Sequence, residues 1–241
     1  MMRRWGLVCL MSIAAIPVSA QFAPPRVVGV INQPNSGDRS QAMLDDRRYL
    51  IDRGVETSIF RGDILNVYRE HRLSRRMPEP LRLFIGTMTI TDSQRGSSVG
   101  VFTPHEPMMS QAVIKLKTAL KNDLVVPRLI LDSGVLFDAG QFALNPRTQA
   151  EFAKVAEFVQ MFSPAKLVIE GHTDSDGEDM SNLRLSEQRA GEIRQYLINN
   201  YAFISAGMIE ARGFGESRPL VPNDSRENKA LNRRIEVIVW E

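Results

Sequence analysis

The stretch GHTDSDGEDMSNLRLSEQRA, from Gly171 to Ala190, decides the fold of the second half of the chain. It is preceded by the apolar run LVIE at residues 167–170, which is typical of a buried strand. The turn-forming residues SDG follow at 175–177. We therefore expect Asp174 to lie at the end of the strand, with its carboxylate exposed.

The helix predicted after this turn, from about residue 182 to residue 199, carries an arginine on its apolar face. The apolar residues that share this face fall at i, i+8 and i+12: Leu185, Ile193 and Leu197. Arg189 lies in the middle of their stripe, and an arginine that faces the interior needs a partner. Two partners fit. One is Asp174, in a buried ion pair, and the other is a ligand with an ammonium and a carboxylate that lies between the two side chains.

The spacing of these residues resembles the motif of the OmpA-like peptidoglycan-binding domain. The matching positions are Thr173-Asp174, Gly177, Asn182, Leu185-Ser186 and Arg189-Ala190. A second signature of the family, Asn-Arg-Arg before the last strand, is present as Asn232-Arg233-Arg234. Many fixed positions at the right spacing make this match more specific than one short motif. The resemblance covers roughly residues 125 to 241.

The resemblance implies a ligand and a role for the two charges. In the family, the Asp and the Arg hold the free amino-acid centre of diaminopimelate in the stem peptide of peptidoglycan. This assigns Asp174 to the ammonium and Arg189 to the carboxylate. The other candidate residues of the binding site, some of which also suit turns and caps, are Thr173, Asn182, Leu185 and Arg233.

Two neighbouring residues are interpreted as parts of the scaffold. We expect His172 to be a strand residue that faces a neighbour and not a ligand. We expect Arg234 to be a solvated charge ahead of the last strand. The sequence has no second His-rich cluster and no Ser or Cys in a recognisable nucleophile setting, so we predict no metal, no cofactor and no catalysis.

The first twenty residues are typical of a signal peptide. They combine Arg3 and Arg4 with an apolar run from Trp5 to Ile16 and small residues that suggest cleavage before Gln21. The run is too short to span a membrane, so no transmembrane segment is predicted. The single cysteine, Cys9, lies inside the run, and the mature chain should therefore have neither a disulfide nor a lipid anchor. We expect a periplasmic protein associated with the cell wall or the outer membrane.

The charge balance excludes one class of partner. The whole chain has 30 Lys and Arg against 28 Asp and Glu, and removal of the first twenty residues leaves 28 of each. A net charge near zero gives no electrostatic case for nucleic acid.

We expect three parts after the signal peptide. Residues 21–104 contain short strands broken by glycines and polar turns, which predict a small all-β domain, either a barrel or a sandwich. Residues 105–127 are predicted to be a helical linker, with an apolar stripe over 108–121. Residues 128–241 form the domain that carries the motif.

The last part has the pattern strand, helix, strand, helix, strand, strand. The first strand is predicted at 129–135, and the first helix is predicted to start with Asn145 as its cap and Pro146 in its first turn. Residues 214–232 are predicted to be a long irregular loop. This order predicts an α+β fold, βαβαββ, with its helices on one face of a mixed sheet, which the resemblance also implies.

These features favour a non-catalytic protein that binds peptidoglycan and tethers an envelope or motor assembly to the cell wall. The first part resembles β-domains of periplasmic flagellar-motor proteins, which implies an unidentified envelope or motor partner. The alternatives are an enzyme that acts on the cell wall and a structural oligomeric envelope component, in flagellar or secretion machinery, in which wall binding is secondary.

Overall fold

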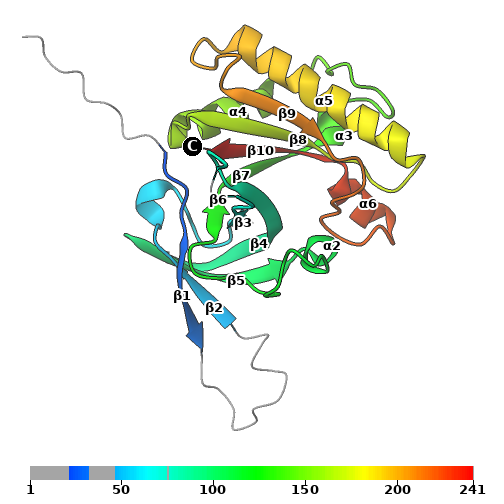
Figure 1. Ribbon diagram of the computed structural model, residues 1–241. Helices are drawn as coiled ribbons and strands as arrows, with labels where there is room; N and C mark the ends of the chain where they lie inside the picture. Colours follow the sequence, from blue (N-terminus) through cyan, green and yellow to red (C-terminus); the bar gives the residue numbers. More distant parts are fainter. Residues whose placement is uncertain (1–21, 33–46, 75, 241) are drawn as a thin grey trace, which may run out of the picture.

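A computed structural model of the protein describes residues 22–32, 47–74 and 76–240 (Figure 1). The expected signal peptide at residues 1–20 lies outside the described residues. The described chain forms two sheets, one of six strands from the first half and one of four strands from the second half. Among the described helices, none combines the length and the apolar character that crossing a membrane requires.

The six-stranded sheet is antiparallel and curls into a barrel. Its strands are β1 (Val27–Asn32), β2 (Arg47–Ile51), β3 (Ile64–His71), β4 (Leu81–Gln94), β5 (Ser97–Pro104) and β6 (Leu124–Val126), in the spatial order β1-β2-β5-β4-β3-β6, with a short 3-10 helix η1 (Val55–Thr57). The two ends of this order meet where Arg26 bridges to Leu124, and there the amide of Val27 donates to the carbonyl of Asp123 at 2.9 Å. The strand-rich first part is thus confirmed.

The helix predicted over residues 108–121 is wrong. This segment contains the four-residue helix α2 (Glu106–Met109), and turns connect it to β6. Of the predicted stripe, Met109 is buried but Leu116 is 57% exposed, whereas Ile114 and Ala119 pack inside the barrel. The ammonium of Lys117 donates to the carbonyl of Met109 and holds the segment in a compact turn. The boundaries 21–104, 105–127 and 128–241 remain a prediction.

The four-stranded sheet has the order β7-β10-β8-β9 and confirms the predicted α+β fold. Its elements are β7 (Arg128–Asp132), α3 (Ser133–Leu136), α4 (Gln149–Phe162), β8 (Lys166–Gly171), α5 (Asp179–Asn200), β9 (Ile209–Gly213), α6 (Arg226–Asn232) and β10 (Arg234–Trp240). Strands β8 and β9 are parallel and the other pairs are antiparallel, so the sheet is mixed. Helices α4 and α5 cover one face (Figure 1).

Three local boundaries differ from the prediction. Strand β7 is shorter, and α3 follows it at once. Helix α4 begins at Gln149 and not at Pro146, because the side chain of Asn145 accepts from a backbone amide two residues on, at 3.1 Å, and forms a turn. Helix α6 lies within residues 214–232, which were expected to be irregular.

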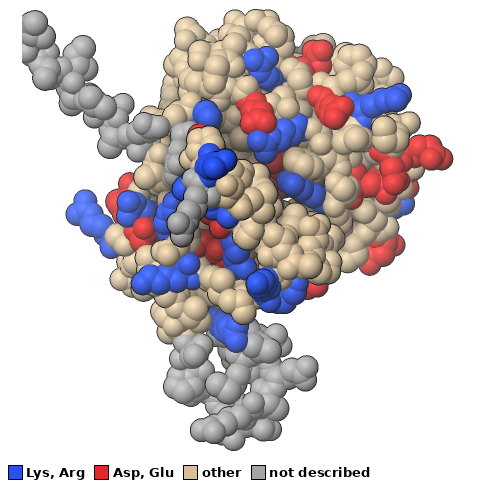
Figure 2. All heavy atoms as spheres, viewed as in Figure 1, with Lys and Arg blue, Asp and Glu red and all other residues tan. Residues whose placement is uncertain are grey.

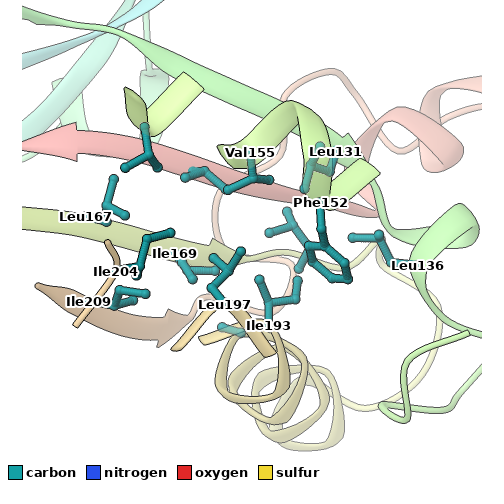
Figure 3. Packing of buried hydrophobic residues seen from close by; sticks show 14 of the residues in the cluster. Leu131, Leu136, Phe152, Val155, Leu167, Ile169, Ile193, Leu197, Ile204 and Ile209 are labelled. Atoms are coloured by element: carbon teal, nitrogen blue, oxygen red, sulfur yellow. The ribbon is translucent and has the colours of Figure 1, made fainter. Parts of the chain in front are cut away.

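The core of this half lies between the sheet and the helices α4 and α5 (Figure 3). Phe152 of α4 is fully buried in a cluster with Leu131, Leu136 and Ile193. Its ring also stacks on Tyr196 of α5, with ring centroids 4.1 Å apart. This stacking joins the two helices to each other as well as to the sheet.

The barrel covers the other face of the four-stranded sheet. The apolar side chains that meet there come from both halves: Tyr68, Leu124, Val126, Val168 and Ile238. A group of buried charges lies beside them. The carboxylate of Glu236 accepts from Arg128 at 2.8 Å, from Arg234 at 2.7 Å and from the barrel residue Asn66 at 3.1 Å.

The expectation that Arg234 is solvated is therefore wrong. This residue is 4% exposed, and its guanidinium lies against Glu236. The cause is the barrel, which covers the face of β10 that would otherwise meet water.

The surface shown in Figure 2 carries charges of both signs. Lys and Arg side chains are interspersed with Asp and Glu side chains over this face. This distribution agrees with the nearly balanced totals of 30 and 28.

Helix α5 packs directly on the end of β8 through a glycine. A Cβ atom added to Gly171 would lie 2.3 Å from the carbonyl oxygen of Ser186 on α5. Since that atom belongs to the helix backbone, no side-chain rotation can relieve the clash. The helix approaches this closely because residue 171 has no side chain.

We predict that Gly171→Ala destabilises the protein by about 2 kcal/mol or more, since either α5 or β8 must shift. Gly191→Ala is the matched control, because Gly191 is a residue of α5 at which an added Cβ atom meets nothing within 4 Å. In the helix interior this control should add about 0.5–1 kcal/mol of stability. Chemical unfolding of both variants measures the difference, and equal stabilities would contradict the close approach.

Candidate functional site

A pocket of about 560 Å³ opens at the end of the four-stranded sheet, beside α5. All six residues that the sequence singled out line it: Thr173, Asp174, Asn182, Leu185, Arg189 and Arg233. They come from the segment after β8, from α5 and from the segment between α6 and β10. The pocket therefore brings together residues that are up to 60 positions apart in the sequence.

Asp174 is held by the turn that follows β8. It is 6% exposed, so the expectation that its carboxylate is exposed is wrong. One oxygen of its carboxylate accepts from the amide of Asp176 at 3.1 Å, and the other accepts from Arg233 at 2.5 Å. The amide of Thr173 donates to the carbonyl of Gly215 at 2.9 Å, which ties the turn to the segment after β9. The Thr173 hydroxyl is buried and has no hydrogen-bond partner among the described residues.

Asn182 supports the same turn from α5. Its side-chain amide donates to the carbonyls of Asp174 and Asp176, at 3.3 and 3.1 Å, and to the carboxylate of Glu216 at 2.7 Å. These bonds connect the Asn182 side chain to the turn that carries Asp174. Leu185 lies one turn before Arg189 and is one of the apolar residues of the wall.

Arg189 is a nearly buried cation with neutral partners. Its guanidinium donates to the carbonyl of Gln141 at 2.9 Å, to the hydroxyl of Ser133 at 3.2 Å and to the carbonyl of Asp138 at 3.4 Å. It also lies 5.0 Å from the centre of the Phe137 ring. Burial and the nearby Arg233 lower the pKa of Arg189, while Asp174 raises it.

The two alternatives for Arg189 can now be separated. Within the described chain, Asp174 and Arg189 form no ion pair with each other, and the carboxylate of Asp174 pairs with Arg233 instead. A direct Asp174–Arg189 bridge is therefore not the partner that this arginine has. The interpretation that leaves room for a ligand between the two side chains fits the geometry.

The sequence analysis did not identify one wall of the pocket. This wall comes from the segment around α3 and includes Ser133, Gly134, Phe137, Asp138, Ala139 and Gly140. The turn-forming residues at 137–140 were recognisable, and Gly140 has a φ of 68°. No spacing rule connects them to Arg189, because they are about 50 residues away in the sequence.

A second group of polar residues lies under the barrel, and its composition raises the question of a metal. Glu170, His172 and Glu236 each offer a ligand atom, and these atoms lie within 4.8 Å of one another. Glu236 already accepts from Arg128 and Arg234. Burial and the adjacent arginines lower the pKa of His172, and the guanidinium groups would repel a divalent cation. The group fits a buried salt-bridge network better than a metal centre.

The fold and the pocket define a small α+β domain in which one carboxylate and one guanidinium face the same cavity without pairing. Comparison with known protein families gives one match in this part of the chain: the OmpA family matches residues 136–233.

Outer membrane porin F of Pseudomonas aeruginosa is 39% identical over 114 residues, which are 47% of this chain and 32% of that protein. The outer-membrane lipoprotein YfiB of the same species is 35% identical over 109 residues, which are 45% of this chain and 64% of that protein. Among solved structures, the periplasmic domain of Helicobacter pylori MotB is 24% identical with a TM-score of 0.42, over 48% of this chain and 82% of that one. The match to the first curated relatives spans about a third of their length.

The buried network predicts a pH dependence of stability. Burial raises the pKa of Glu170 to about 7, from an ordinary value of 4.5, although Arg218 opposes the shift. The pKa of Glu170 is higher in the folded than in the unfolded chain, so its protonation stabilises the folded state. This contribution of Glu170 to the free energy of unfolding is complete below about pH 4.5 and is lost as the pH rises through 7. The free energy of unfolding of the wild type, minus that of Glu170→Gln, should fall by about 3 kcal/mol between pH 4.5 and pH 8.

Urea unfolding of both chains over this pH range measures the difference. The folded pKa of His172 is lowered, so its own contribution to stability increases with pH, opposite to that of Glu170. Because His172 is present in both chains, this contribution largely cancels in the comparison. A difference that stays flat across the range would contradict a buried, protonated Glu170.

Proposed function

We propose that the C-terminal half binds peptidoglycan through diaminopimelate of the stem peptide and that the protein tethers an envelope or motor assembly to the cell wall. The observation that carries this proposal is that Asp174 and Arg189 line one pocket but do not pair with each other. A nearly buried guanidinium without an anionic partner is costly unless a ligand supplies one. The match of the OmpA family to residues 136–233 supports the same ligand.

Binding requires an ammonium at Asp174 and a carboxylate at Arg189. A guanidinium has five N–H donors, and three bonds to Gln141, Ser133 and Asp138 leave one donor on each terminal nitrogen of Arg189. Two donors are what a bidentate carboxylate uses. The neutral acceptors fix the guanidinium before the ligand arrives, which reduces the entropy lost on binding.

The surroundings of the pocket favour recognition without catalysis. The Ser133 hydroxyl bonds to Arg189, and the Ser186 hydroxyl bonds to the carbonyl of Leu183 and the amide of Gly215. Neither hydroxyl bonds to a histidine or a carboxylate, so neither has the base that a serine nucleophile requires.

The location and the second partner follow from the two halves together. Two relatives named outer-membrane proteins support a place in the cell envelope, and we infer a periplasmic protein. The barrel would contact the envelope or motor partner, because it covers the sheet face opposite the helices and leaves the pocket open.

We predict that Asp174→Ala and Arg189→Ala each weaken binding to diaminopimelate-type peptidoglycan by about 2–5 kcal/mol, since each change leaves one charged group of the bound ligand without its partner. Arg184→Ala is the matched control: this arginine is on the same helix, is exposed and does not line the pocket. Co-sedimentation with purified peptidoglycan measures the loss, after circular dichroism has confirmed that the variants are folded.

A second arm uses lysine-type peptidoglycan, whose stem residue lacks the additional carboxylate. The wild type should bind it more weakly, because Arg189 then has no anion to contact. If the wild type fails to sediment with diaminopimelate-type peptidoglycan, or if both folded variants bind as it does, the proposed site is wrong.

A further inference from the structure

Asp174 already has a cation in this structure, and that cation belongs to the protein. The terminal nitrogen of Arg233 lies 2.5 Å from one carboxylate oxygen of Asp174, at the position that the ligand's ammonium would take in the proposed function. The Asp174 side chain is 8% exposed, so there is little room for two cations at that oxygen. A ligand amine must therefore displace Arg233.

The side chain of Arg233 is held by fewer contacts than that of Arg189. Its side chain is 41% exposed, and among the described residues Asp174 is the single hydrogen-bond partner of its guanidinium. Arg189, by comparison, is 5% exposed and makes three bonds. Arg233 also lines a neighbouring pocket with Asp176 and Lys229, so a displaced side chain has space on either side.

We propose that Arg233 is the residue that restricts the pocket to amines carrying an adjacent carboxylate; this inference rests on the proposed function. When an amino-acid head enters, its ammonium replaces Arg233 on Asp174, and its carboxylate is shared by Arg189 and the released Arg233. Every charge keeps a partner in this exchange.

A lone amine cannot complete the exchange. It would take Asp174 and leave Arg233 without that anion: Arg189 lies on one side, and on the other side Asp176 already pairs with Lys229 at 2.6 Å. Burial lowers the pKa of Arg189 most, and the nearby Arg233 lowers it further, so the two guanidinium groups already interact unfavourably. Like charges brought together in a half-buried pocket raise the free energy of the complex. Arg233 therefore penalises amines without a carboxylate and spares amino acids.

The test compares two small ligands with the same spacing between their ammonium groups. meso-Diaminopimelate has both groups, and 1,5-diaminopentane keeps the two ammonium groups but lacks the carboxylates. NMR titration of the mature chain should give a large ratio of dissociation constants, diaminopentane over diaminopimelate. In Arg233→Gln this ratio should fall by about tenfold, because the competing cation is gone.

Two control variants fix the interpretation. Arg61→Gln removes an exposed arginine of the barrel that lines neither pocket, and it should leave the ratio unchanged. Arg233→Lys keeps a cation and should restore most of the ratio. An unchanged ratio in Arg233→Gln would overturn the inference while leaving diaminopimelate binding, and with it the proposed function, intact. Failure of the wild type to bind diaminopimelate would overturn both.

A measurement on the unmodified protein covers the case in which Arg233→Gln does not fold. The Nε–H signal of Arg233 should shift when diaminopimelate is added, because the guanidinium exchanges one carboxylate for another. A signal that stays in place while the ligand binds would show that Arg233 remains on Asp174 and would refute the exchange.

Discussion

The backbone contact between α5 and the end of β8 determines the geometry of the pocket. The helix lies so close that a Cβ atom on Gly171 would be 2.3 Å from the carbonyl oxygen of Ser186. The Ser186 hydroxyl also accepts from the amide of Gly215 at 2.9 Å, which fixes the rotation of α5 about its axis. Arg189 follows Ser186 by three residues and faces the same way, towards the place where Asp174 leaves the sheet. The two charges thus face one cavity because a glycine lets a helix touch a strand.

Much of this arrangement was predictable from the sequence, because it depends on local spacing. Arg189 interrupts an apolar stripe, Asp174 follows a strand, and both residues line the pocket. The wall around Asp138 was not predictable, since only the tertiary fold brings it to α5. Arg234 was misassigned because it alternates with the core residues of β10 and should face water in a sheet with helices on one side. The barrel covers that second face, and the local pattern of residues in β10 does not indicate that a second layer packs there.

The prediction of a helix at 108–121 is wrong for a related reason. Apolar residues at helical spacing indicate a helix if they share one surface to pack on. Here Met109, Ile114 and Ala119 are buried at intervals of five residues, which no regular helix presents on one face. The interior of the barrel accepts them from an irregular chain, and the ammonium of Lys117 donates to the carbonyl of Met109 within this segment. Tertiary packing therefore overrides a weak local preference.

The pocket contains two arginines whose freedom differs, and this difference separates affinity from selectivity. Arg189 is held by three neutral acceptors before any ligand arrives, so a carboxylate gains its bonds with little ordering of the protein. Arg233 has one partner and is 41% exposed, so its position depends on which anion is nearest. A fixed cation contributes binding free energy to every ligand with a carboxylate. A movable cation on Asp174 imposes a cost that only a ligand with its own anion offsets, and discrimination of this kind depends on the repulsive element as much as on the attractive one.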